Sequence, residues 1–317
     1  MIVAVTGGTG FIGQKLLARL LGQGDTVRLL TRSSATTEKS SLLKMHQCDL
    51  LTAGVNELAA MLDGVDVVYH CAGQLKDSHA MRALHVDATR KLAEAASGRV
   101  AHWVQLSSVG VYGPVTAGTV TENTVSNPVG EYEITKTESD QIVVDAAHQG
   151  GFSYSLLRPS NVFGAGMTNQ SLFGLTSMIQ RGLFFYIGKP GASANYVHVD
   201  DVVEGLLRCG TMPAAHGKTY NLSDHCTMEQ FVAVIAQALG KDAPHMRLPE
   251  APVRLLARWA GRLPGFPLTE ARVDALTNRA IYSNSKIERE LGYRHVISMQ
   301  QGLLELVDAW KRKVAPQ

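Results

Sequence analysis

Residues 2–13 read Ile-Val-Ala-Val-Thr-Gly-Gly-Thr-Gly-Phe-Ile-Gly, a short apolar run that passes directly into a glycine-rich turn. Residues 11–21 continue from this turn with the apolar spacing of an amphipathic helix. A strand, a tight glycine turn and a helix in this order are typical of the first unit of a doubly wound α/β fold, in which helices cover both faces of a parallel sheet.

Short β-branched runs alternate with helical patterns through the first half of the chain, as this fold requires. The expected strands are 2–6, 26–30, 45–49, 65–71, 103–107 and 154–158. The expected helices are 11–21, 55–61, 81–96 and 130–148.

The pattern changes after Pro159, where loops rich in Gly, Ser and Asn appear, and helical patterns dominate from Met228 onward. We therefore expect a dinucleotide-binding (Rossmann) domain formed by residues 1–162 and about 195–222. Residues from about 163–194 and 223–317 are expected to form a smaller, mostly helical substrate-binding domain.

The composition argues against several classes of protein. Lys and Arg number 30 against 28 Asp and Glu in 317 residues, so the formal net charge is only +2 and a nucleic-acid partner is not expected. The four cysteines form no CxxC pair, and neither a disulfide framework nor a metal site is expected. Because neither a signal peptide nor an apolar run of about 18 residues is evident, we expect a cytoplasmic protein.

The glycine turn predicts a site for a dinucleotide pyrophosphate. Gly7, Gly10 and Gly13 allow a tight turn and a close approach of the backbone to the phosphates, and Phe11 and Ile12 stand in the first turn of the helix. The N-terminus of that helix offers free N–H groups and the positive end of its dipole. The alternative is a tight turn with no ligand.

The end of the second strand indicates which dinucleotide is used. Arg32 stands where an acidic residue would bind the ribose hydroxyls of NAD, and with Ser33 and Ser34 it suits the 2′-phosphate of NADP. We expect NADP, with NAD as the alternative if Arg32 is only a solvated charge. Asp49 and Leu50 are expected near the adenine ring, although Asp49 is equally suited to cap a helix or turn.

A candidate acid/base group stands in the helix expected at 130–148. Tyr132 and Lys136 are four residues apart and therefore share one helix face, where the ammonium would lower the pKa of the phenol. Ser108 follows the strand expected at 103–107, at the sheet edge where ligands of open α/β folds bind. It is suited to hydrogen-bond the substrate oxygen that gains or loses a proton.

Taken together, these motifs resemble an extended short-chain dehydrogenase/reductase of the NAD-dependent epimerase/dehydratase type. The matching segments occur in the family's order: residues 6–13, 70–73 (His-Cys-Ala-Gly), Ser108 with 111–113 (Val-Tyr-Gly), 132–136, 158–164 (Arg-Pro-Ser-Asn-Val-Phe-Gly) and 197–202.

This resemblance implies hydride transfer between a nicotinamide cofactor and a sugar carbon, with Tyr132 as acid/base. Lys136 would lower the tyrosine pKa and hold the nicotinamide ribose, and Ser108 would polarise the hydroxyl or ketone. Ala72 would contact the cofactor, and Asn161 would lie near the diphosphate of the substrate. Members of the family often form homodimers, and we expect one here.

Two departures from the family pattern stand out. The arginine that many nucleotide-sugar epimerases carry before the aromatic residue of the 197–202 block is absent, since residues 194–198 read Ala-Asn-Tyr-Val-His. A diphosphate clamp would then need other cations, with Arg181, Lys189 and Arg272 as candidates. In addition, His85 stands where the family usually has asparagine, so the support of the active-site helix is expected to differ.

We therefore expect a reductase or epimerase that acts at C4 of a nucleotide-activated sugar, and Arg32 favours a 4-keto-sugar reductase. The alternatives are a 4-epimerase with bound NAD and a reductase of apolar ketones resembling dihydroflavonol or 3β-hydroxysteroid enzymes. A non-catalytic dinucleotide sensor is disfavoured because Tyr132 and Lys136 are both present.

Residues 252–263 carry arginines on one helical face and apolar side chains on the other. Such a helix can lie on an anionic membrane. A domain helix with a solvated arginine face is the favoured interpretation, so no membrane contact is expected.

Overall fold

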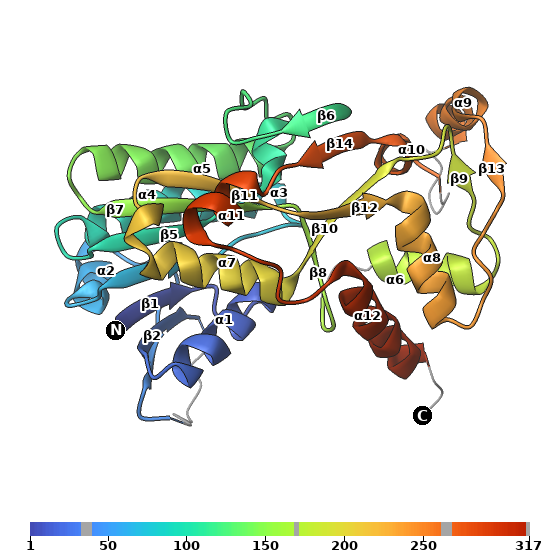
Figure 1. Cartoon of the computed structure of the whole chain (residues 1–317). Coiled ribbons are helices and arrows are strands. Elements are labelled where there is room, and N and C mark those ends of the chain that lie inside the picture. Colours follow the sequence, from blue (N-terminus) through green and yellow to red (C-terminus); the bar gives the residue numbers. More distant parts are fainter. Residues whose placement is uncertain (33–39, 168–170, 261–267, 315–317) are drawn as a thin grey trace.

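The computed structural model describes residues 1–32, 40–167, 171–260 and 268–314. Its centre is a seven-stranded parallel sheet, which confirms the predicted doubly wound α/β fold (Figure 1). In spatial order the strands are β3 (Leu43–Gln47), β2 (Thr26–Thr31), β1 (Ile2–Thr6), β4 (Val67–His70), β5 (His102–Leu106), β7 (Ser153–Pro159) and β11 (Lys218–Leu222).

Six of these strands correspond to the predicted ones, with shifts of a few residues at their ends. Strand β3 begins two residues before the predicted start and ends before Asp49. The seventh strand, β11, was not predicted individually. It pairs with β7 from Lys218 opposite Ser155 to Leu222 opposite Pro159.

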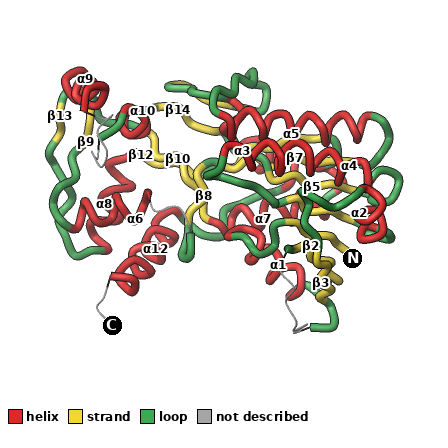
Figure 2. The backbone as a smooth tube through the Cα atoms, turned by 180° about the vertical axis from the view of Figure 1, so that it is seen from behind, coloured by secondary structure: helices red, strands yellow, loops and turns green. Residues whose placement is uncertain are grey.

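Helices cover both faces of the sheet (Figures 1 and 2). On one face, α1 (Phe11–Gly22), α7 (Val199–Thr211) and α11 (Ser285–Leu291) share an apolar core with β1 and β4. On the other face, α2 (Val55–Leu62), α4 (Thr89–Ala96) and α5 (Glu131–His148) pack around the fully buried ring of Trp103.

The single helix predicted for residues 81–96 is wrong. A short helix α3 (Ser78–Arg82), capped by Asp77, passes into a π-helical turn η1 (Ala83–Ala88) before α4 begins. Such π-turns occur frequently at functional sites, because the widened turn redirects side chains. His85 lies within this one.

Most of the remaining described residues form a smaller unit beside the sheet, seen on the right of Figure 1. Its three-stranded sheet consists of β8 (Asn161–Phe163), β10 (Ser193–His198) and β12 (Asp224–Thr227). Helices α6 (Ser171–Gln180), α8 (Met228–Ala238) and α12 (Met299–Val314) pack around the buried rings of Phe163 and Phe231.

Two pairs of short strands complete this unit and connect it to the large sheet. Strands β9 (Tyr186–Ile187) and β13 (Arg247–Leu248) lie beside α9 (Glu250–Ala260) and α10 (Glu270–Thr277). Strand β14 (Arg279–Tyr282) pairs with β6 (Ala117–Val120), which follows the 3₁₀ turn η2 (Val109–Tyr112) after β5. A second 3₁₀ turn, η3 (Pro213–Ala215), precedes β11.

Helix α9 differs in part from its prediction. Its arginines pair with carboxylates, Arg254 with Glu250 and Asp274 and Arg258 with Glu270, as a solvated polar face would. The buried apolar residues are Val253 and Ala257, however, whereas the predicted apolar face remains exposed at Leu255, Leu256 and Trp259. Arg262 and Leu263 lie outside the described residues.

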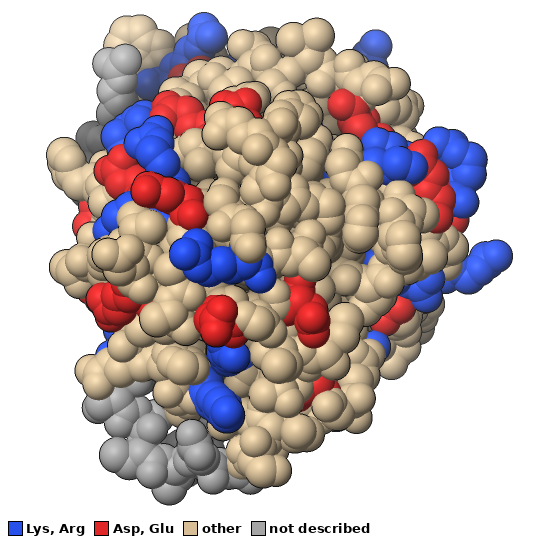
Figure 3. Space-filling model, turned by 90° about the vertical axis from the view of Figure 1, so that its left-hand side faces the viewer, with Lys and Arg blue, Asp and Glu red and all other residues tan. Residues whose placement is uncertain are grey.

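Charges of both signs are interspersed on the face of the molecule seen in Figure 3, where Lys and Arg lie among Asp and Glu. Within the described part of the chain, no helix is long and apolar enough to cross a membrane.

Steric contact fixes the glycine turn after β1. Gly7 has a φ of +69°, and a Cβ atom on it would lie 2.6 Å from the backbone of Cys71 and Ala72. Gly13, in the first turn of α1, comes so close to the turn that a Cβ atom on it would lie 2.2 Å from the Gly7 carbonyl oxygen. The helix can therefore approach the strand only where side chains are absent.

We expect Gly13→Ala to lower the free energy of unfolding by about 1–3 kcal/mol, because the methyl group would force the helix away from the turn. Gly22→Ala is the matched control in the same helix, since nothing lies within 4 Å of its added Cβ. This control should be neutral or stabilise the protein by up to about 1 kcal/mol. Urea unfolding measures both, and an equal effect of the two substitutions would contradict the steric account.

Candidate active site

The structure brings the three predicted catalytic side chains together at the carboxyl end of β5. Ser108 follows β5 and caps η2, while Tyr132 and Lys136 lie in the first turns of α5. The Ser108 hydroxyl lies near enough to the Tyr132 phenol to act on its pKa. The Lys136 ammonium donates to the Leu106 carbonyl oxygen, at 2.6 Å, so all three groups meet where the strand ends.

The backbone holds the Ser108 hydroxyl in place. Its Oγ accepts the N–H of Gly110 at 3.0 Å, a bond that closes the first turn of η2. Because the oxygen is used here as an acceptor, its hydrogen remains available for donation. Ser108 can therefore donate to Tyr132 or to the oxygen atom of a ligand.

The prediction that Lys136 lowers the pKa of Tyr132 is not borne out by the net shift. Burial raises the pKa of the phenol to about 12, although the neighbouring Ser108 hydroxyl acts in the opposite direction. The carboxylates of Glu133 and Asp140 add to the increase. Tyr132 is therefore a neutral phenol at ordinary pH, which is the protonation state of a proton donor.

Lys136 is only 4% exposed, and burial lowers its pKa. The Asp140 carboxylate, one turn further along α5, works against this shift and favours the charged ammonium. Asp140 is itself buried, accepting a hydrogen bond from the Ser107 hydroxyl at 2.6 Å and forming an ion pair with Arg158 at 3.3 Å. A buried cation and a buried anion thus occupy successive turns of one helix.

The glycine residues predicted to hold a cofactor form a cradle against a second loop. Gly10 N–H donates to the Gly7 carbonyl oxygen at 2.9 Å, and α1 begins at Phe11 with Ile12 and Gly13 in its first turn. The loop after β4 lies directly against Gly7 at Ala72. The turn carries no side chain at Gly7, Gly10 or Gly13 and leads into an N-terminus of α1 that no side chain caps, so it fits a pyrophosphate that approaches the backbone closely.

Arg32 and Asp49 lie together beside the ends of β2 and β3. Both line a cavity of about 240 Å³ that also includes Thr52 and Glu57. Asp49 also accepts the N–H of Leu51 at 3.0 Å, as the turn-capping interpretation predicts. The Leu50 side chain is buried in the core and does not line this cavity. Ser33 and Ser34 lie outside the described residues.

The predicted substrate residues are separated in space. Asn161 is exposed at the start of β8, and its side-chain amide donates to the Asn195 carbonyl oxygen at 3.2 Å. Arg181 follows α6 and lines a cavity of about 340 Å³ together with Lys241 and Met246.

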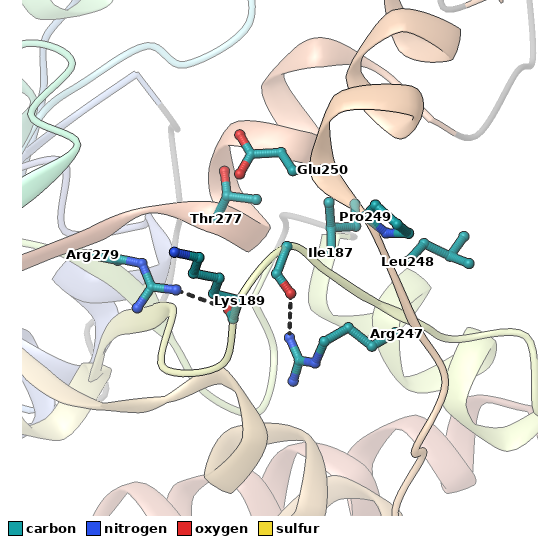
Figure 4. Close-up of a pocket in the computed structure, with 9 residues that line it drawn as sticks. Ile187, Lys189, Arg247, Leu248, Pro249, Glu250, Thr277 and Arg279 are labelled. Atoms are coloured by element: carbon teal, nitrogen blue, oxygen red, sulfur yellow. Dashed lines mark hydrogen bonds between the residues drawn. The ribbon is translucent and has the colours of Figure 1, made fainter.

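A different cavity of about 540 Å³ is lined by Lys189, one of the predicted candidates, and by two arginines that the sequence did not indicate (Figure 4). Lys189 and Arg279 line it side by side, and Arg247 lines it from β13. Arg279 donates to the carbonyl oxygens of Lys189 and Gly191, at 2.9 and 3.3 Å, and so braces the turn that carries Lys189. The chain separation of 90 residues between Lys189 and Arg279 gives no local signal for this pairing.

Three buried histidines have strongly depressed pKa values, and burial lowers the pKa of the buried His198 as well. Burial, followed by the charge of Lys136, lowers the pKa of His70 and of His85 to about 3. Burial lowers the pKa of His102 to about 4, and its ring hydrogen-bonds the hydroxyls of Ser153 and Ser155. Across the described ranges, no group of three or more His, Cys, Asp or Glu residues is arranged to hold a metal ion.

A family model described as the NAD dependent epimerase/dehydratase family matches residues 3–223 of this chain. The 4-hydroxy-2-methyl-3-oxo-4-farnesyl-3,4-dihydroquinoline-1-oxide ketoreductase of Stigmatella aurantiaca is 27% identical over 316 residues, covering 94% of this chain and 93% of the relative. The dTDP-6-deoxy-L-talose 4-dehydrogenase (NAD(P)(+)) of Kitasatospora kifunensis is 37% identical over 180 residues, covering 55% of this chain and 56% of the relative.

Among solved structures, the UDP-glucuronic acid 4-epimerase from Bacillus cereus in complex with NAD is similar, with a TM-score of 0.75. It covers 99% of both chains at 20% identity. A likeness at this level of identity shows a common fold.

The buried histidines predict that stability falls in mild acid. The unfolded chain binds protons at His70, His85 and His102 below their ordinary pKa of 6.5, whereas the folded chain keeps them neutral. Each histidine therefore lowers the free energy of unfolding by about 1.4 kcal/mol per pH unit below that value. His295 opposes this trend: burial lowers its pKa, but the carboxylates of Asp201, Asp224 and Glu288 together raise it by more.

From pH 7.5 to 5.5 we expect the free energy of unfolding to fall by about 3 kcal/mol, as measured by urea titration. An unchanged or higher value at pH 5.5 would contradict the assignment of neutral buried histidines.

Proposed function

Because the chain belongs to the NAD-dependent epimerase/dehydratase family of extended short-chain dehydrogenases/reductases, which use NAD(P), we propose that it reduces the 4-keto group of a nucleotide-activated sugar with NADPH. Ser108, Tyr132 and Lys136 carry the reaction in this proposal. The smaller unit, residues 163–194 and 223–317, provides most of the substrate site.

The uncompensated positive charge of the 540 Å³ cavity is the observation that carries the substrate class. Arg247 is neutralised there by Glu229, at 2.7 Å, and the lining residue Glu250 pairs with Arg254. Lys189 and Arg279 have no carboxylate partner among the described residues. Two unpaired cations beside one hollow favour a ligand with negative charge, such as a diphosphate.

The chain connects this cavity to the acid/base group. Arg279 begins β14, which pairs with β6, and β6 follows the turn capped by Ser108. In this proposal the phosphates of the substrate bind Lys189 and Arg279, its ketone binds Ser108 and Tyr132, and the strand pair lies between them.

In the proposed reaction, the ketone oxygen accepts hydrogen bonds from Ser108 and Tyr132. The nicotinamide supplies the hydride when NADPH is bound. The Tyr132 phenol gives its proton to the oxygen as the negative charge develops there, which completes the alcohol. The neutral phenol, with its pKa raised to about 12, already carries the proton that this direction requires.

Arg32 supports NADP as the cofactor. It is exposed at the end of β2, where NAD-dependent relatives need an acidic residue, and it lines the cavity next to Asp49. An arginine here accommodates the 2′-phosphate that distinguishes NADP from NAD.

Reduction of an apolar ketone is the second candidate, because the relative from Stigmatella aurantiaca is a farnesyl-dihydroquinoline ketoreductase that matches nearly the whole chain. An apolar ligand needs a largely hydrophobic wall. The unpaired Lys189 and Arg279 disfavour it, since burying either cation against a hydrocarbon would cost free energy without compensation.

We expect the protein to oxidise NADPH in the presence of a dTDP- or UDP-4-keto-6-deoxyhexose and to use NADH at least 10-fold less efficiently, as followed by absorbance. Tyr132→Phe should abolish turnover without weakening NADPH binding, because only the acidic proton is lost. Tyr154→Phe, an equal change in β7, is the control and should retain full activity.

Preference for NADH would contradict the assignment of the cofactor. Turnover by Tyr132→Phe would contradict the proposed acid, and reduction of a farnesylated quinolone but not of the 4-keto sugar would favour the second candidate.

Lys189→Ala should raise the KM for the nucleotide sugar about 10-fold with little change in kcat, because a charge-assisted hydrogen bond to phosphate is lost. Arg279→Ala should have at least this effect, since Arg279 also braces the turn of Lys189. Arg181→Ala, in the separate cavity, is the matched control. If Arg181→Ala raises the KM and Lys189→Ala does not, the proposed phosphate site is wrong.

A further inference from the structure

His85 connects two parts of the active site that belong to different elements. It is 1% exposed and lies in the π-helical turn η1, between the loop after β4 and the first turns of α5. Its Nε2 atom is 2.9 Å from the backbone nitrogen of Gln74 in the loop. Its Nδ1 atom is 2.9 Å from the hydroxyl oxygen of Thr135 in the helix.

The partners of His85 fix where its proton lies. A backbone N–H can only donate, so Nε2 accepts from Gln74 and the proton of the neutral ring is on Nδ1. The Thr135 hydroxyl donates to the Glu131 carbonyl oxygen at 2.8 Å, which leaves its oxygen free to accept from Nδ1. The one donor and the one acceptor of the neutral imidazole are therefore both used. A second proton, on Nε2, would point at the Gln74 N–H and break that hydrogen bond.

The hydrogen bonds of His85 to Gln74 and to Thr135 form a bridge between the loop and the helix. Both ends of this bridge are next to groups of the proposed reaction. Thr135 precedes Lys136, and the His85 ring stands edge-on to the Tyr132 ring, with centroids 5.7 Å apart and an interplanar angle of 78°. The loop end lies one residue from Gly73 and two from Ala72, which touches the glycine turn at Gly7. His85 thus spans from the cofactor cradle to the proposed acid.

We propose that His85 is a positioning residue that couples the cofactor loop to the catalytic helix through its two ring nitrogens. This inference rests on the proposed roles of Tyr132 and of the glycine cradle. An asparagine, usual in the family, carries its donor and acceptor on a shorter side chain and can satisfy only one of the two partners in this arrangement. The imidazole spans both from its place in the π-turn.

Two substitutions separate the two bonds. In His85→Asn, the amide nitrogen takes the place of Nδ1, so the hydrogen bond to Thr135 is kept and the one from Gln74 is lost. In His85→Gln, the side-chain oxygen takes the place of Nε2, so the hydrogen bond from Gln74 is kept and the one to Thr135 is lost. We expect His85→Asn to weaken NADPH binding about 10-fold, with kcat at saturating NADPH within twofold of the wild type. We expect His85→Gln to bind NADPH within twofold of the wild type and to lose about 10-fold in kcat.

Two threonines of the same helix provide the matched pair of controls. Thr135→Val removes the helix end of the bridge and should reproduce His85→Gln. Thr137→Val removes an equivalent hydroxyl, which bonds the Glu133 carbonyl oxygen at 2.8 Å, and should change neither quantity. NADPH binding is measured by the fluorescence of the reduced nicotinamide, and the melting temperature of each variant without cofactor reports folding.

The split between binding and turnover decides the inference. It is overturned if both His85 variants bind NADPH as the wild type does, or if both lose affinity and kcat in the same proportion as they lose thermal stability. The binding measurement needs no substrate, so a wrong substrate class in the proposed function would not affect it. In that case the NADPH affinities of His85→Asn, His85→Gln and Thr135→Val alone support or overturn the bridge.

Discussion

The buried hydrogen bond from the Lys136 ammonium to the Leu106 carbonyl oxygen is the contact on which the candidate active site depends. It fixes the first turns of α5 against the end of β5, so that Tyr132, one turn earlier, lies beside Ser108. Removing this bond would leave a buried cation without its acceptor, which is more costly than the bond itself is stabilising. One hydrogen bond, from Lys136 to Leu106, therefore fixes both the geometry of the candidate site and the packing of α5 on the sheet.

This buried cation requires a buried anion nearby, and Asp140 supplies it. Asp140 binds Ser107 and Arg158, and the Arg158 guanidinium donates to the Tyr112 hydroxyl at 3.1 Å. The Tyr112 hydroxyl in turn donates to Asn221 of β11 at 2.8 Å. The candidate site is thus supported from behind by a polar network that extends across three strands of the sheet, and the parallel-sheet architecture holds its charges at fixed positions.

The parts of the site that the sequence predicts are those defined by local spacing. The glycine turn, the Tyr132 and Lys136 pair and Ser108 each lie within a few residues of a strand or helix end, where the backbone alone determines their place. Such local patterns do not show how deeply a side chain is buried. They therefore predicted neither the increase in the pKa of Tyr132 nor the burial of the Leu50 side chain.

Features that join distant segments of the chain could not be predicted from these local patterns. Lys189 was one of three candidate cations, but its pairing with Arg279 depends on how β14 packs beside the turn after β9. The π-turn at His85 likewise reflects contacts with α5 and the loop after β4, whereas residues 81–96 have the spacing of an ordinary helix. Helix α9 buries Val253 and Ala257 because the neighbouring α10 and β9, not the amphipathic pattern, determine which side is covered.

In the proposed reaction, hydride passes from NADPH to C4 of a nucleotide-activated sugar held between Ser108 and Tyr132. The most direct test is to incubate the protein with NADPH deuterated at the transferred position of C4 of the nicotinamide and a dTDP-4-keto-6-deoxyhexose, and to locate the label by NMR. We expect one deuterium at C4 of the product sugar for each NADPH oxidised. A product sugar without deuterium, or epimerisation of a 4-hydroxy sugar without net oxidation of NADPH, would contradict it.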